Sequence, residues 1–94
     1  MAEKEDTLKQ EVDNVIEKMN ALVDDRSVPK NIRAAVERAR DKLSGPEEIA
    51  VKISGAGYEL EDISNDINMP SHARTQIWEL ISDLEFLREK TKEK

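Results

Sequence analysis

Few side chains in this sequence have the types or spacing that acid–base or nucleophilic chemistry needs. His72 is the only histidine, there is no cysteine, and Ser71 stands directly beside His72. Neighbouring positions on a helix point about 100° apart, so an adjacent serine and histidine do not form a catalytic dyad. We expect His72 to be a partly exposed histidine and assign no catalytic residue.

Metal and cofactor sites also lack their sequence signatures. Di-iron helical bundles need two Glu-x-x-His motifs, and the chain contains none. The run from Ser54 to Gly57 lacks the glycine spacing and the lysine of a phosphate-binding loop. The carboxylates lie mostly away from the apolar positions, where no burial tunes them as acids or bases. We predict no metal, no cofactor, no small-molecule substrate and no enzymatic activity.

The most specific pattern is an aspartate, a proline and an arginine spaced Asp-x-x-x-Pro-x-x-x-Arg. An aspartate in a turn can accept the N–H groups of that turn. The arginine can fold back to the aspartate or to the carbonyls that end the previous helix. We therefore predict a structural clasp at each copy, with a binding role for the arginines as the alternative. The pattern occurs twice, 41 residues apart, as Asp25, Pro29, Arg33 and as Asp66, Pro70, Arg74.

Four helices are predicted around these turns, because apolar residues recur at intervals of three and four. The helices span about residues 4–24, 29–43, 47–63 and 70–89. Proline suits the first turn of a helix, so Pro29 and Pro70 should begin the second and the fourth. Gly45 should cap the second helix, and Pro46 can open the third. Gly55 and Gly57 should allow close helix packing, with a functional kink as the alternative.

The apolar positions of the first half align without gaps on those of the second half at an offset of 41 residues. A single helical hairpin cannot bury its apolar face, so two hairpins must close one core. We predict an all-α protein, a four-helix bundle of roughly up-and-down topology built from two repeated hairpins. The 94 residues form one domain, with hairpins at about 4–43 and 47–89 and a frayed tail at 90–94.

Charge is unevenly distributed along the chain. Charged residues make up 38% of the sequence and the net charge is −6, which opposes non-specific nucleic-acid binding. The second helix is basic, and we expect its charges to complement the acidic helices on either side. The alternative is an RNA- or ribosome-associated protein that uses Lys30, Arg38, Arg40 and Lys42. The polar N-terminal residues and the lack of a long apolar run predict a cytoplasmic protein without membrane contact.

Three aromatic residues depart from the apolar stripes. At about 100° per residue, Trp78 and Phe86 project away from the stripe of the fourth helix, and Tyr58 points opposite that of the third. They form either a second seam within the bundle or an exposed patch for a partner. We favour the seam for Tyr58, which shares its line with Val51, and the patch for Trp78 and Phe86. The partner is a second copy in a symmetric dimer or another protein.

Two runs carry a family resemblance: residues 24–33, and residues 62–66 with residues 69–78. They resemble the signature of a small archaeal family known as uncharacterised protein family zero-one-four-seven. The resemblance covers nearly the whole chain. It implies an archaeal, cytoplasmic, all-helical four-helix bundle and no assigned activity. We therefore expect a non-enzymatic interaction or structural module of unknown biological role that self-associates.

Overall fold

The computed structural model describes residues 2–92, and it describes side chains from residue 7 onward. These residues form four α-helices and no strand, which confirms the predicted all-α class. The helices are α1 (Ala2–Val23), α2 (Lys30–Leu43), α3 (Ile49–Ile63) and α4 (Ser71–Thr91). Their bounds lie close to those expected from the apolar spacing.

The two clasp prolines stand just before their helices and not at the first helical position. Pro29 has φ −54° and ψ 149°, and Pro70 has φ −62° and ψ 153°, so both are extended entry residues. Their carbonyls accept the first helical bonds, from Arg33 N–H at 3.0 Å and from Arg74 N–H at 2.9 Å. The fixed φ of proline therefore sets the direction in which the chain enters each helix.

The connection between α2 and α3 differs from the prediction. α2 ends at Leu43 as expected, but no described glycine has a positive φ, so Gly45 does not form a left-handed cap. Pro46 and Glu47 precede α3, and the Glu48 carbonyl accepts the N–H of Lys52 at 3.0 Å. The helix therefore begins two residues later than predicted.

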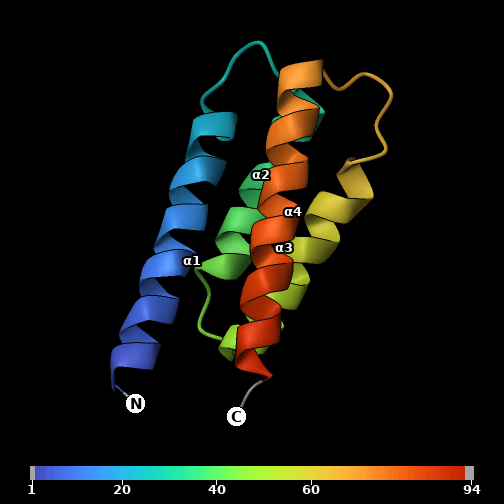
Figure 1. The fold of residues 1–94 in the computed structure, drawn as a ribbon. Coiled ribbons are helices and arrows are strands. Elements are labelled where there is room, and N and C mark those ends of the chain that lie inside the picture. The colour runs from blue at the N-terminus through green and yellow to red at the C-terminus, as the bar shows by residue number, and fades with distance from the viewer. Residues whose placement is uncertain (1, 93–94) are drawn as a thin grey trace.

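The helices run alternately up and down, and each packs against two neighbours (Figure 1). α1 lies between α2 and α4, and α3 lies between the same two helices on the other side. The termini emerge at one end of the bundle, while the α1–α2 and α3–α4 turns lie at the opposite end. The turns that carry both Asp-x-x-x-Pro-x-x-x-Arg patterns therefore share one end of the molecule.

One apolar core runs the length of the bundle, with contributions from all four helices. Its largest fully buried side chains include Met19, Leu22, Ile53 and Leu60. Val28 and Met69, the residues before the two prolines, are also buried and close the core at the turn end. Their burial explains why each pattern carries a bulky apolar residue before its proline.

The prediction of a frayed segment from residue 90 is wrong for residues 90 and 91. Both belong to α4, and Lys90 Nζ lies 2.8 Å from the Glu11 carboxylate of α1. This ion pair and a cation–π contact of Lys90 with Phe86, 4.8 Å from the ring centroid, hold the last turn. Residues 93 and 94 lie outside the described residues. Over residues 2–92, no helix combines the length and apolar character that crossing a bilayer requires.

Candidate functional site

Each turn at the shared end of the bundle is closed by an aspartate. Asp25 Oδ1 accepts the backbone N–H of Ser27 at 2.9 Å and the hydroxyl of Ser27 at 2.6 Å. Asp66 Oδ1 accepts the backbone N–H of Asn68 at 2.8 Å. Both aspartates thus make the turn that was expected from their position after a helix.

The two arginines fold back onto backbone carbonyls and not onto the aspartate carboxylates. Arg33 donates from Nε to the carbonyl of Val28 at 3.0 Å. Arg74 donates from its two terminal nitrogens to the carbonyls of Ser64 and Asp66, both at 3.2 Å. The Ser64 carbonyl lies at the end of α3, and the Asp66 carbonyl lies in the turn that follows, where it also accepts the N–H of Met69 at 3.3 Å. Arg74 therefore supplies a donor to the free end of α3 and a second donor to the turn. The contribution of this clasp to stability stays a prediction.

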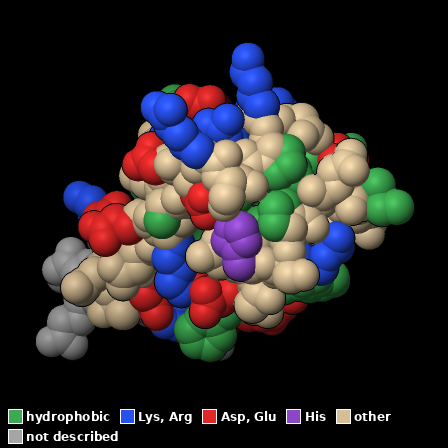
Figure 2. Space-filling model, turned by 90° about the horizontal axis from the view of Figure 1, so that it is seen from above, with side chains coloured by type: hydrophobic (Ala, Val, Ile, Leu, Met, Phe, Trp, Pro, Cys, Tyr) green, Lys and Arg blue, Asp and Glu red, His purple; other side chains and the backbone are tan. Residues whose placement is uncertain are grey.

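A second set of contacts joins the two turns to each other, and sequence reasoning missed it. His72 Nε2, in the first turn of α4, lies 3.0 Å from Asp25 Oδ2. Asn31, in the first turn of α2, donates to Asp66 Oδ2 at 2.8 Å. Figure 2 shows the histidine at this end of the molecule among acidic side chains. Asn31 and His72 both stand two residues after a clasp proline, and that shared offset is the signal that could have found them.

The group of Asp25, Ser27 and His72 does not have the geometry of a nucleophile and its base. A relay needs one ring nitrogen on the serine and the other on the carboxylate. Here the same Nε2 lies 3.1 Å from the Ser27 hydroxyl and 3.0 Å from Asp25, and Ser27 donates its proton to Asp25. The contacts of His72 with Asp25 and Ser27 therefore link the two turns. That the protein is not an enzyme stays a prediction.

Acidification should weaken the turn end through Asp25. Hydrogen bonds from the Ser27 hydroxyl and N–H, and then from His72, lower the pKa of Asp25 below its usual range. A carboxylate of lowered pKa stabilises the fold above its unfolded-state pKa of about 4, and this contribution is lost as the pH falls through the folded-state value. We expect Asp25→Asn to reduce the melting temperature at neutral pH. Its melting temperature should then fall less steeply than that of the wild type between about pH 5 and pH 1.

The matched control for this titration is Asp24→Asn, since the Asp24 side chain is exposed and makes no hydrogen bond within the described structure. It should keep the wild-type dependence of melting temperature on pH. Equal slopes for Asp25→Asn and the wild type would show that the turn contacts do not act through this carboxylate.

The basic side chains of α2 mostly pair within the molecule. Arg38 and Lys42 both bind Glu59 of α3, at 3.2 Å and 2.8 Å, and these two cations lower the pKa of Glu59, with Lys42 the stronger influence. Arg40 donates to Asn20 of α1 at 2.9 Å. Lys30 is exposed. Three of the four candidate RNA contacts are thus engaged by neighbouring helices. Arg38 and Lys42 match the predicted complementarity of charge with α3, whereas Arg40 meets a neutral amide on α1 and pairs with Glu37 and Asp41 of its own helix.

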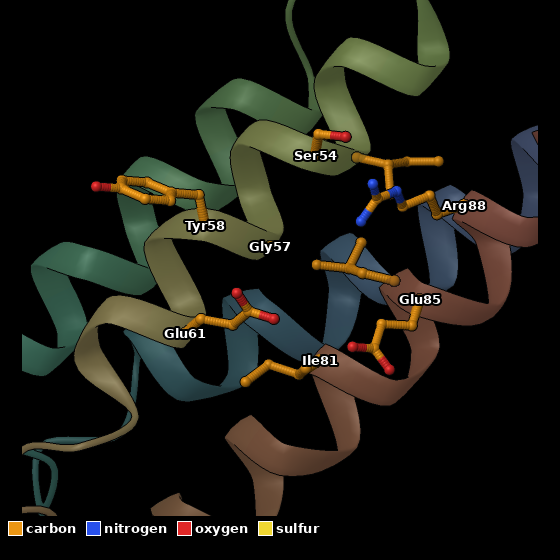
Figure 3. Close-up of a pocket in the computed structure, with 9 residues that line it drawn as sticks. Ser54, Gly57, Tyr58, Glu61, Ile81, Glu85 and Arg88 are labelled. Carbon is orange, nitrogen blue, oxygen red and sulfur yellow. The ribbon is translucent and has the colours of Figure 1, made fainter.

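The exposed apolar side chains gather on one half of the molecule. Trp78 is 56% exposed and Phe86 is 59% exposed, so both are available to a partner. Tyr58 is 69% exposed, so the favoured prediction that it covers a seam between helices is wrong. It points away from the space between α3 and α4 (Figure 3), because its position lies opposite the apolar stripe of α3. Val51 on the same line is 54% exposed.

A groove between α3 and α4 was also missed from the sequence. Its volume is about 240 Å³, and it opens over Gly57, where a Cβ atom would meet nothing within 4 Å. At Gly55, by contrast, a Cβ would lie 3.3 Å from Cδ of Lys42, so only Gly55 serves the predicted close packing. The groove is lined by Ile53, Ser54, Gly57, Tyr58, Glu61, Ile81, Leu84, Glu85 and Arg88.

A wider hollow of about 510 Å³ lies at the other end of the bundle, among residues of α1, α3 and the end of α2. It borders Leu8, close to the segment whose side chains are not described. Over the described residues, no cluster of histidine and carboxylate side chains could hold a metal ion.

The family model for the uncharacterised protein family UPF0147 matches residues 1–87. The chain belongs to UPF0147. A UPF0147 protein of Methanothermobacter thermautotrophicus is 45% identical over 76 residues, which span 80% of this chain and 74% of that protein. One of Archaeoglobus fulgidus is 38% identical over 77 residues, or 82% and 88% of the two chains. These relatives are archaeal, as the resemblance implied.

Solved structures share the UPF0147 fold. A crystal structure of a UPF0147 protein from Thermoplasma acidophilum has a TM-score of 0.80 at 32% identity, covering 86% of this chain and 98% of that one. A crystal structure of a protein of unknown function has a TM-score of 0.78 at 42% identity, covering 80% and 86%. UPF0147 is an uncharacterised family, so membership gives the fold and assigns no activity.

Proposed function

We propose that this UPF0147 chain is a non-enzymatic interaction module that self-associates through the outer face of α4. One observation carries the proposal: the exposed large hydrophobic side chains all lie on α3, α4 and the turn between them. They are Val51, Tyr58, Ile67, Trp78 and Phe86, within the part of the chain whose side chains are described. Exposed apolar side chains on neighbouring elements are typical of a surface that a partner covers. We also propose that the protein resides in the cytoplasm.

The outer face of α4 suits a symmetric partner. Trp78 and Phe86 stand four residues before and after Ser82, and each is displaced from it by about 40° around the helix. Ser82 is small and exposed, so a second α4 can approach closely there. In an antiparallel pairing about Ser82, each Trp78 would face the partner's Phe86. A two-fold axis makes this contact twice, as an isologous interface requires.

Such a dimer should be weak. Trp78 and Phe86 can each bury roughly 150–250 Å², so together they bury roughly 300–500 Å² on each protomer. A stable interface buries roughly 800 Å² on each partner. Each protomer also carries a net charge of −6, so raising the salt concentration should strengthen association by screening repulsion. Salt weakens contacts with nucleic acid instead. If the protein were retained on an RNA column and released by salt, the alternative of an RNA-associated protein that uses α2 would therefore be favoured.

Trp78 is the only tryptophan, so its fluorescence reports directly on this face. We expect its emission maximum to move to shorter wavelength as the protein concentration rises, because the indole leaves water when α4 pairs with a second copy. Phe86→Ala should keep the dilute-solution emission at every concentration. The exposed residue Glu17 of α1 supplies the matched control, since Glu17→Ala should shift as the wild type does. A wild-type emission that is the same at all concentrations would contradict self-association through α4.

A further inference from the structure

Nothing in the fold requires a glycine at position 57. It lies inside α3, where glycine is among the least favourable residues. Its φ is not positive and a Cβ would meet no atom within 4 Å, so neither the backbone nor packing requires glycine there. Gly55 differs, because Lys42 packs against it and reaches Glu59 at 2.8 Å. What Gly57 does provide is open space.

That space is a depression with apolar side chains at its base and polar or charged side chains around it. Its floor is formed by Ile53, Ile81 and Leu84, which are buried core residues. Its volume of about 240 Å³ lies below the range of roughly 300–1,000 Å³ that is usual for small-molecule sites. The groove therefore fits one side chain of a larger partner better than it fits a separate small ligand.

The first half of the chain has different residues at the positions that correspond to this groove. Forty-one residues before Gly57 stands Ile16, which packs against the core. Arg40 corresponds to Ile81 and crosses from α2 to Asn20 on α1. At the corresponding positions of the first half, a branched side chain packs against the core and an arginine spans α1 and α2, whereas Gly57 leaves the groove between α3 and α4 open.

The rims of the groove favour a cationic partner. Glu61 reaches from α3 toward α4, and Glu85 stands on α4 across the opening (Figure 3). Neither carboxylate has an ion-pair partner among the side chains that the structure describes. Glu59, on the opposite side of α3, is by contrast bound by two cations. Arg88 lies toward the Ser54 end of the groove, so the negative charge is concentrated at the Glu61 end.

We propose that the groove over Gly57 is a docking site for a basic segment of another protein, which places one apolar side chain over Gly57 and a lysine or arginine between Glu61 and Glu85. The apolar side chain covers the floor that Gly57 exposes, and the cation neutralises the two carboxylates. The residues involved are not those of the α4 outer face. The docking site therefore does not depend on self-association.

A library of random dodecapeptides displayed on phage, selected on the full chain, tests this docking site. We expect enriched peptides to carry an aliphatic or aromatic residue within one turn of a lysine or arginine. A synthetic peptide of the enriched sequence should shift the amide resonances of Ser54, Gly57 and Glu61, and leave those of α1 unchanged. Failure to enrich any sequence, or enrichment of acidic sequences, would overturn the proposal.

Variants of the groove make the test specific. Gly57→Ile should weaken binding of the selected peptide at least tenfold, because the new side chain occupies the groove. It should keep or raise the melting temperature, because a Cβ at this position meets no atom within 4 Å and isoleucine suits a helix better than glycine. Glu61→Gln combined with Glu85→Gln should weaken binding by a similar factor. Glu79→Gln, which removes a carboxylate of α4 outside the groove, should leave it unchanged. Equal binding by the wild type and Gly57→Ile would place the peptide elsewhere and overturn the proposal. If Gly57→Ile lowers the melting temperature, Gly57→Leu provides the same filled groove for the comparison.

Discussion

Arg74→Ala lowers the free energy of unfolding by about 2–3 kcal/mol, the largest stability effect that we expect from any polar residue of the turns. A hydrogen bond that involves a charged group contributes roughly 1.5–3 kcal/mol, and Arg74 donates to two carbonyls, one at the end of α3 and one in the turn that follows. One of them belongs to Ser64, which is buried, so its carbonyl cannot easily turn to water. For a domain of this size the melting temperature should fall by roughly 4–8 °C per kcal/mol. Thermal unfolding followed by circular dichroism measures the shift.

Arg38→Ala is the matched control, because Arg38 is an exposed arginine whose partner among the described side chains is Glu59. Surface ion pairs contribute about 0–1 kcal/mol, so this variant should unfold close to the wild type. Arg33→Ala should fall between the two, since Arg33 donates to the single carbonyl of Val28. Arg74→Lys should not restore stability, because an ammonium group lacks the planar fork that reaches two carbonyls. Equal stability of Arg74→Ala and Arg38→Ala would contradict the prediction that the contacts of Arg74 stabilise the fold.

Replacing both Trp78 and Phe86 by alanine weakens self-association at least a hundredfold. Each residue supplies apolar area on both sides of the proposed two-fold axis, so the double variant removes four aromatic side chains from the interface. Both side chains are more than half exposed in the single chain, so their loss should leave the core intact. The melting temperature of the monomer should fall only slightly, because Phe86→Ala also removes the cation–π contact with Lys90, which contributes about 0.5–1 kcal/mol at an exposed site. Sedimentation velocity over a range of concentrations measures the association.

The control for the double variant places two alanine substitutions on the opposite half of the molecule. Ile16 and Val23 are partly buried, so they cannot be removed without disturbing the core. Glu17 and Glu37 are exposed, and they stand 41 residues before Tyr58 and Trp78. Glu17→Ala with Glu37→Ala should associate as the wild type does, or more tightly because two negative charges are lost. Loss of association in this control would show that α1 and α2 form the interface instead.

The fold could be predicted because local signals and burial agree in this chain. Apolar residues that recur at intervals of three and four indicate helices, and Met19, Leu22, Ile77 and Leu80 from such runs are all buried. Pro29 and Pro70 marked the starts of two helices to within one residue. The last turn of α4 was missed, because it is held by the contact of Lys90 with Glu11 across the bundle, which no local pattern reveals.

The candidate sites could be predicted only in part, because they include contacts between residues that are far apart in the sequence. The turn made by Asp25 is local and could be predicted, whereas its contact with His72 joins residues 47 positions apart. Tyr58 was misplaced because its angle on α3 leaves open whether a neighbouring helix covers it. Gly57 was read as a packing residue, and only the empty space beside it distinguishes it from Gly55. In each case the missing information was which helix lies opposite.

Sedimentation equilibrium of the wild-type chain, from micromolar to near-millimolar concentration, tests the central proposal of self-association most directly. We predict that the apparent mass rises from the 10.7 kDa of one chain toward twice that value, and that it rises further at a given concentration when salt is added. A mass of 10.7 kDa at every concentration and salt level would contradict the proposal.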